Sequence, residues 1–122
     1  MPLIEVANSE VLDKYSILEI KSQEIRDHAQ LHIVETERKS LSPVANALLD
    51  VPGVRQPYAR LLEINRKIWH DMEAVYRAEA ANLGIPHQLV VDIIADNQTR
   101  AEIKREIDTL TLSNTREAKS FF

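Results

Sequence analysis

Polar and charged side chains interrupt an otherwise apolar helix face in the segment DNQTRAEIKREID (96–108). At 100° per residue, Asp96, Arg100 and Lys104 project on the same side as the neighbouring isoleucines, and Asn97 lies beside them. A charge buried alone is costly, so these groups need an ion pair, an edge open to water or a ligand. Two cations with an amide suit a phosphate or carboxylate better than a divalent metal. The segment therefore predicts an anion site or an ion-pair network that fixes helix register, and both interpretations stay open.

The helix before this segment is expected to supply its partners. The link LGIP (83–86) is short, which makes the two helices that it joins neighbours. With a turn centred near residue 85, the predicted pairs are Glu73 with Asn97, Trp69 or His70 with Arg100, and Arg66 or Asn65 with Lys104. Glu73 and Asp96 are then the predicted carboxylates for Arg100, and Trp69 is expected to stack on its guanidinium group.

The glycine content and the apolar periodicity favour an all-α fold. The chain has only two glycines, and β-hairpins need turn residues that are scarce here. Helical spacing predicts three long helices, over about Glu10–Ser40, Tyr58–Leu83 and Pro86–Leu112. We expect an antiparallel bundle of three long helices plus a short helix, in a single domain that covers residues 1–122.

Short segments between these helices are predicted from their turn and cap residues. LIEV (3–6) is expected to form an extended arm, followed by a helix cap in ANSE (7–10) at its Asn or Ser. Pro43 is expected in a connector that holds the short helix VANALLD (44–50). Gly84 is the predicted C-terminal cap of the second long helix.

The first long helix is apolar on two sides. One stripe at spacings of three and four consists of Val11, Tyr15, Leu18, Ile25, Ala29 and Ile33. Ile17, Ile20 and Leu31 point away from this stripe. A helix with two apolar sides needs two partners, so it lies centrally or lends its second side to another chain. The second option predicts a homodimer.

Composition and charge exclude several classes of protein. The 122 residues carry 15 Lys and Arg against 19 Asp and Glu, a net charge of −4, with the two signs interleaved. A nucleic-acid surface or a polybasic membrane anchor needs a basic face, so neither partner is expected. The absence of cysteine rules out disulfides and thiolate zinc sites and fits a reducing cytoplasm. No apolar run approaches the ~18 residues of a membrane helix, so a soluble cytoplasmic protein is expected.

Two metal-dependent alternatives are weaker. His28 and His32 are four residues apart, with Glu35 one turn further, a spacing that can hold zinc but equally suits a solvated helix edge. Glu10-x-x-Asp13 and Glu24-x-x-Asp27 match one motif of all-α nucleotide pyrophosphohydrolases. Magnesium needs several convergent carboxylates, and the second of these pairs projects away from the core stripe. Nucleophilic catalysis has no support, because G-x-S-x-G and a Gly-rich phosphate loop are missing.

Four segments carry a resemblance to a known family. They are LIEVANSEVLDKYSILEIK (3–21), NRKIWHDMEAVYRAE (65–79), DNQTRAEIKREID (96–108) and SNTREAKSFF (113–122). Together they resemble a family of small uncharacterised bacterial proteins with the patterns L-I-E-V-S-x-G-E-L-x-D-K-x-S-I-L-E-I-K, N-x-x-L-W-x-I-E-D, N-D-x-R-x-x-I-K-R-x-I-N and S-x-x-x-E-x-K-S-Y. Members often lie near genes for surface-polysaccharide or lipopolysaccharide synthesis. The resemblance implies a role in that process and supplies no activity.

The resemblance also implies a set of polar positions. These are Glu10, Asp13, Lys14, Ser16, Glu19, Lys21, Asn65, Trp69, Glu73, Asn97, Arg100, Lys104, Arg105, Glu117, Lys119 and Ser120. The chain departs from the family pattern before Glu10 and around Asn97. Asp108 replaces an Asn, and Phe121 replaces a Tyr, which removes a hydroxyl group.

These patterns together predict a polar site between the last two helices, completed by the first helix or the C-terminal tail. The predicted ligand-binding residues are Asn65, Trp69, Glu73, Asp96, Asn97, Arg100, Lys104, Asp13, Lys14 and Glu19. The expected ligand is an anionic small molecule, no cofactor or metal is expected, and enzymatic activity is left open. The alternatives are an oligomeric scaffold with a structural ion-pair network and a magnesium-dependent pyrophosphohydrolase.

Overall fold

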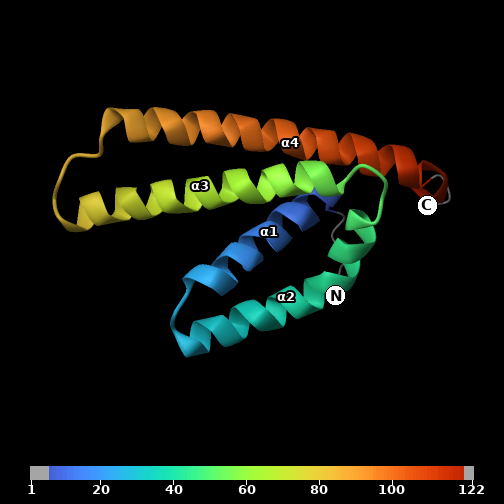
Figure 1. The fold of residues 1–122 in the computed structure, drawn as a ribbon, viewed down its shortest axis with the longest axis horizontal. Helices are drawn as coiled ribbons and strands as arrows, with labels where there is room; N and C mark the ends of the chain where they lie inside the picture. The colour runs from blue at the N-terminus through green and yellow to red at the C-terminus, as the bar shows by residue number, and fades with distance from the viewer. Residues whose placement is uncertain (1–5, 120–122) are drawn as a thin grey trace.

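The chain forms four helices in the computed structural model, which describes the backbone of residues 6–119 and the side chains of residues 6–112 (Figure 1). They are α1 (Asn8–Glu24), α2 (His28–Leu49), α3 (Arg55–Ala80) and α4 (His87–Lys119). The described residues contain no strand, so the all-α class is confirmed. Residues 3–5 of the predicted arm and the side chains of the C-terminal tail lie outside the described residues.

The first predicted long helix is wrong, because the chain breaks it into α1 and α2. Ile25, which follows α1, has extended backbone angles of φ −78° and ψ 134°. Asp27 is also extended, and its carboxylate accepts a hydrogen bond of 3.0 Å from the backbone N–H of Gln30. A carboxylate in this position satisfies a free amide of the first turn. Asp27 therefore starts a new helix at His28 where the apolar spacing alone predicted continuation.

The predicted connector at Pro43 is wrong as well. Pro43 lies inside α2, and VANALLD (44–50) forms the last turns of that helix instead of a separate short one. A proline in a helix interior removes one backbone hydrogen bond and crowds the preceding turn. Burial of Ala45, Leu48 and Leu49 in the core stabilises the turns that follow and offsets this cost.

A short turn ends α3 before the predicted glycine. Asn82 adopts a left-handed backbone with φ 56°, and the N–H of Leu83 donates to the carbonyl of Ala78 at 2.9 Å. This is the pattern by which a left-handed residue satisfies the last carbonyls of a helix, and Asn is the usual substitute for Gly there. Gly84 is therefore not the cap, and the turn lies nearer to residue 82 than to residue 85.

α3 and α4 lie side by side, and α1 packs against α2, α3 and α4 (Figure 1). Arg60 on α3 pairs with Glu106 on α4, and Lys67 further along α3 pairs with Asp96 nearer the start of α4. The core draws its buried residues from all four helices and the turn before α3. These are Leu12, Ala45, Leu48, Leu49, Val54, Leu61, Ile103 and Ile107.

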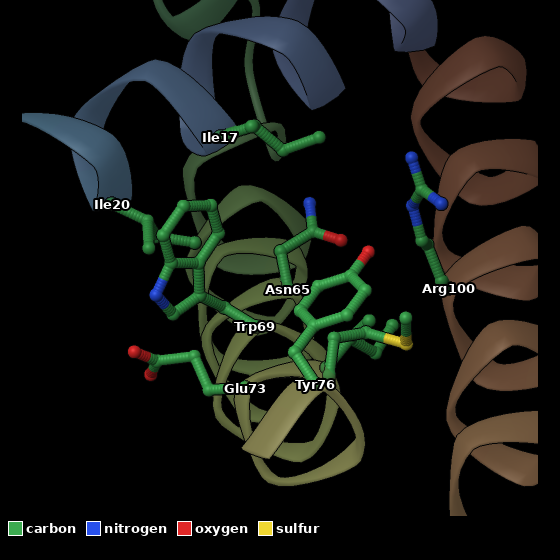
Figure 2. A pocket seen from close by; sticks show the side chains of 9 residues that line it. Ile17, Ile20, Asn65, Trp69, Glu73, Tyr76 and Arg100 are labelled. Carbon is green, nitrogen blue, oxygen red and sulfur yellow. The ribbon is translucent and has the colours of Figure 1, made fainter. Parts of the chain in front are cut away.

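The second apolar side of α1 is covered within the chain. Ile20, which was expected to face a second partner, is 1% exposed, and Ile17 and Ile20 face side chains of α3 across a pocket (Figure 2). α1 and α2 cover only part of the α3–α4 pair, whose end near residues 81–86 extends beyond them (Figure 1). In the described part of the chain, no helix is both long and apolar enough to cross a lipid bilayer.

Candidate functional site

Asp13 on α1 is the centre of a buried polar cluster. Asp13 is only 4% exposed, although it carries a carboxylate, and it follows the core residue Leu12. Arg100 on α4 donates from Nε to Asp13 Oδ1 at 3.0 Å and from Nη2 to Asp13 Oδ2. Two parallel hydrogen bonds fix the orientation of the guanidinium plane as well as its position. The pair therefore fastens α1 to α4.

Asn65 brings α3 into the same cluster. Its Nδ2 donates to Asp13 Oδ1 and to Ser16 Oγ, both at 2.8 Å. Ser16 Oγ donates in turn to the backbone carbonyl of Asp13 at 2.7 Å. Asn65 is 5% exposed and Ser16 is 0% exposed, so these bonds lie in the interior. An amide at this position in the apolar face of α3 is thus explained by a partner on α1.

Lys104 and Glu10 complete the cluster at its solvent edge. Lys104 Nζ donates to Glu10 Oε1 and lies 3.8 Å from Asp13 Oδ2. Glu10 and Lys104 are more exposed than Asp13, as expected for a pair at the rim. Two carboxylates from α1 therefore balance the two cations that α4 places in its inward face.

The charges of the cluster shift the pKa values of its two central groups. Burial raises the pKa of Asp13, but hydrogen bonds from Arg100 and Asn65 and the charges of Arg100 and Lys104 outweigh burial, so the pKa lies below its usual value. The hydrogen bonds to Asp13 raise the pKa of Arg100 despite its partial burial. Both groups are therefore ionised at neutral pH.

A pocket of about 420 Å³ lies beside this cluster between α1 and the α3–α4 pair (Figure 2). Its walls are Ile17, Ile20, Asn65, Ile68, Trp69, Met72, Glu73, Tyr76 and Arg100. Trp69 and Arg100 stand on opposite sides of it (Figure 2). A mostly apolar pocket of a few hundred Å³ with a few polar groups has the dimensions of a small-molecule site.

The structure unites four of the ten predicted site residues in the cluster: Asp13, Asn65, Arg100 and Lys104. The predicted carboxylates for Arg100, Glu73 and Asp96, are wrong. Glu73 contacts His70, with 3.0 Å between Glu73 Oε1 and His70 Nδ1, and Asp96 accepts from Lys67. The reason is that α1 packs against both helices and places Asp13 beside Arg100. The predicted pairs considered only α3 and α4.

Other predicted site residues lie around the cluster or away from it. Trp69 is across the pocket from Arg100, so the predicted stacking is wrong; the described residues place Arg38 over the ring of Tyr15 instead, at 5.9 Å. Asn97 Nδ2 donates to a carbonyl of its own helix, and its Oδ1 lies 3.5 Å from Arg100 Nη1. Lys14 is exposed near Glu37, and Glu19 lies 3.7 Å from Arg38, on the side of α1 that faces α2.

Contacts between α1 and α4 that the sequence did not reveal also hold the site. The backbone N–H and the Oγ of Ser9 donate to the Asp108 carboxylate at 2.9 and 2.8 Å. The predicted local cap of α1 by Asn8 or Ser9 is absent, and Asp108 accepts from the Ser9 amide in its place. In the sequence, the one indication of this contact is Asp108 itself, an acidic residue beside the inward-facing Ile107 of α4.

The metal motifs considered from the sequence are not assembled. Among the described residues, the group whose ligand atoms converge is Glu24, His70 and Glu73, and it does not include His28 or His32. Asp13 is bound by Arg100 and Asn65, and Asp27 caps α2. Of the four carboxylates in the two E-x-x-D motifs, Glu24 belongs to this group, and the other three are held by partners elsewhere.

Comparisons with known proteins give no relative. No family model, curated protein or solved structure matches the chain. The family resemblance of the four sequence segments stays an expectation, and the functional proposal rests on the geometry of the pocket and the cluster.

Proposed function

We propose that the chain binds a small amphipathic molecule in the pocket between α1, α3 and α4. The apolar part of the ligand lies against Trp69, Met72 and Tyr76, and a phosphate or carboxylate group accepts hydrogen bonds from Arg100. The observation that carries this proposal is the position of a fixed, half-buried guanidinium in the wall of a pocket that is otherwise mostly apolar (Figure 2).

Arg100 keeps donor capacity for such a ligand. A guanidinium group has five N–H donors. Asp13 engages Nε and one hydrogen of Nη2, and the contact of Nη1 with Asn97 is long at 3.5 Å. Because Asp13 already neutralises the charge of Arg100, the guanidinium group offers an anionic ligand directional hydrogen bonds and little net electrostatic attraction. The prior orientation of the group lowers the entropy that binding costs.

Trp69 supplies a second polar group. Its Nε1 is buried and has no hydrogen-bond partner among the described residues. A buried donor without a partner costs about 1–3 kcal/mol. The indole nitrogen lies on the side of Trp69 away from Arg100 (Figure 2), so a ligand that recovers part of this cost must extend past the ring and carry a second oxygen or nitrogen there. The family resemblance adds sugar phosphates and nucleotide sugars to the molecules worth testing.

A thermal-shift screen tests the proposal. The purified protein is screened against phosphorylated sugars, nucleotides, nucleotide sugars and medium-chain carboxylates, and a ligand that binds only the folded state raises the melting temperature. Tyr76→Ala removes an exposed wall of the pocket, so the fold should persist while the shift is lost. Ile33→Ala, a similarly exposed apolar side chain on α2, is the matched control. Failure of every compound, or equal losses in both variants, would contradict a ligand site in this pocket.

We also propose that two copies of the chain associate through the end of the α3–α4 pair that α1 and α2 leave uncovered. Large apolar side chains are exposed there, with Leu83 at 67% and Ile94 at 56%, and Val90 is one turn before Ile94 on α4. Contiguous apolar patches beyond a few hundred Å² are rare on monomers and usually mark contact sites. A two-fold pair would bury this surface against itself.

The molar mass in solution tests this association. Sedimentation velocity should give a dimer for the unchanged chain and a monomer for Val90→Lys/Ile94→Lys. In a two-fold contact the new lysines of the two copies would be buried close together, where their like charges repel. Ile33→Lys on α2 controls for a charge placed elsewhere. A monomer for the unchanged chain, or a dimer that survives the double substitution, would refute the association.

A further inference from the structure

A second group of ligating side chains lies where the end of α1 meets α3. Glu24 is the last residue of α1, and His70 and Glu73 are one turn apart on α3. His70 Nδ1 is 3.0 Å from Glu73 Oε1, and His70 Nε2 is 3.5 Å from Glu24 Oε1. One ligand atom from each of the three residues lies within 4.8 Å of the others. We infer that Glu24, His70 and Glu73 bind a divalent transition-metal ion.

Both ring nitrogens of His70 lie beside a carboxylate oxygen. A neutral imidazole has one N–H donor and one lone pair. With a carboxylate oxygen close to each ring nitrogen, one lone pair of a neutral His70 faces a carboxylate oxygen, an arrangement that a metal ion would relieve. A metal bound to one ring nitrogen lies beside one carboxylate, and the other carboxylate turns towards it from the far side of the ring. This replaces a repulsive contact with three coordination bonds.

Basic side chains do not neutralise these two carboxylates. Among the described residues, Glu24 and Glu73 form ion pairs only with His70. Arg66, one turn before His70, donates instead to Gln23 Oε1 at 2.7 Å. That bond fastens the end of α1 to α3 and so holds Glu24 beside His70 without competing for its charge.

The ligand set indicates the class of metal. One imidazole nitrogen and two carboxylate oxygens suit zinc or manganese, whereas calcium and magnesium prefer oxygen ligands alone. Bonds of about 2.0–2.2 Å place ligand atoms of one zinc ion roughly 3–4 Å apart, so the three ligand atoms, which lie within 4.8 Å of one another, need small side-chain rotations to bind it. Three protein ligands leave a position for water. Glu73 also lines the pocket, whereas Glu24 and His70 do not, so substitutions of these two residues test the metal site apart from the ligand proposed for the pocket.

Isothermal titration of chelator-treated protein with zinc chloride near neutral pH tests the inference. We expect one zinc per chain, a higher melting temperature with zinc, and an affinity at least about tenfold lower in His70→Ala and in Glu24→Gln. Because His70 and Glu24 lie at the surface edge of α3 and α1, both variants should keep the melting temperature of the metal-free protein. Cobalt in place of zinc should give visible absorption bands that His70→Ala removes.

The rival pair on α2 supplies the control. His28→Ala/His32→Ala removes the one pair of histidines that are a helical turn apart and should leave the zinc affinity unchanged. Loss of binding in this double variant with retention in His70→Ala would overturn the inference. Absence of zinc binding by the unchanged chain, with zinc in large excess, would overturn it too.

Discussion

Asp13 and Arg100 are 87 positions apart in the chain and meet through two parallel hydrogen bonds in the interior. The carboxylate comes from the first helix and the guanidinium from the last. Asn65 from α3 donates to the same carboxylate, so a single buried anion links three helices. The pocket borders this link on its apolar side, and the position of Arg100 in the pocket wall is therefore set by Asp13.

Removal of Arg100 should destabilise the fold strongly. Arg100→Ala leaves Asp13 buried without its main partner, and breaking a buried pair in this way costs about 3–5 kcal/mol. Lys104 remains 3.8 Å from Asp13 and Arg100 is partly exposed, so the lower end of that range is expected. Urea unfolding measures the change. Arg60→Ala breaks the exposed pair with Glu106 and should cost less than about 1 kcal/mol; equal costs would contradict the central role of the buried pair.

Asp13 should make stability depend on pH in acid. Its pKa in the folded chain is lower than in the unfolded chain, so the unfolded chain binds the proton more readily. The stabilisation by Asp13 is therefore complete above its unfolded pKa of about 4 and is lost as pH falls through the folded pKa. Urea unfolding from neutral to acid pH should show the free-energy difference between the unchanged chain and Asp13→Asn shrinking below about pH 4. A difference that is constant across the whole range would refute this.

Leu12 should be a main contributor to the core. Leu12 is 0% exposed and belongs to the cluster that joins all four helices. Leu12→Ala removes this apolar contact and leaves a cavity, with an expected loss of about 2–5 kcal/mol in the free energy of unfolding. Leu112→Ala changes the same side chain at a position that is 45% exposed and should cost far less. Similar losses in the two variants would contradict the assignment of Leu12 to the core and of Leu112 to the surface.

Asp27 should stabilise the break between α1 and α2 as the N-terminal cap of α2. Asp27→Ala removes the acceptor for the Gln30 amide and should cost about 1 kcal/mol. Asp27→Asn keeps an acceptor oxygen and should stay within a few tenths of a kcal/mol of the unchanged chain. Thermal unfolding followed by circular dichroism distinguishes the two variants. An alanine variant as stable as the asparagine variant would mean that the cap is not the reason for the break.

The sequence by itself determined the helical class and the positions where polar groups enter apolar faces. Scarce glycine and apolar residues at spacings of three and four left helix as the favourable structure, and α3 and α4 follow from that periodicity. The same periodicity placed Asn65, Arg100 and Lys104 on inward faces of their helices without identifying their partners. It could not predict the break at residues 25–27. The apolar spacing continues across these residues, and the hydrogen bond from the Gln30 amide to Asp27 favours a new helix start over one continuous helix.

Only the tertiary structure decided which groups meet. Periodicity fixes the direction of a side chain on its own helix, whereas the partner depends on which helix packs against that side. Pairing α3 with α4 predicted Glu73 and Asp96 for Arg100, but α1 packs against both helices and presents Asp13. The pocket, the Ser9–Asp108 contact and the Glu24–His70–Glu73 group likewise join residues from different helices. A buried charge pairs with the group that helix packing places beside it, and this packing depends on all four helices.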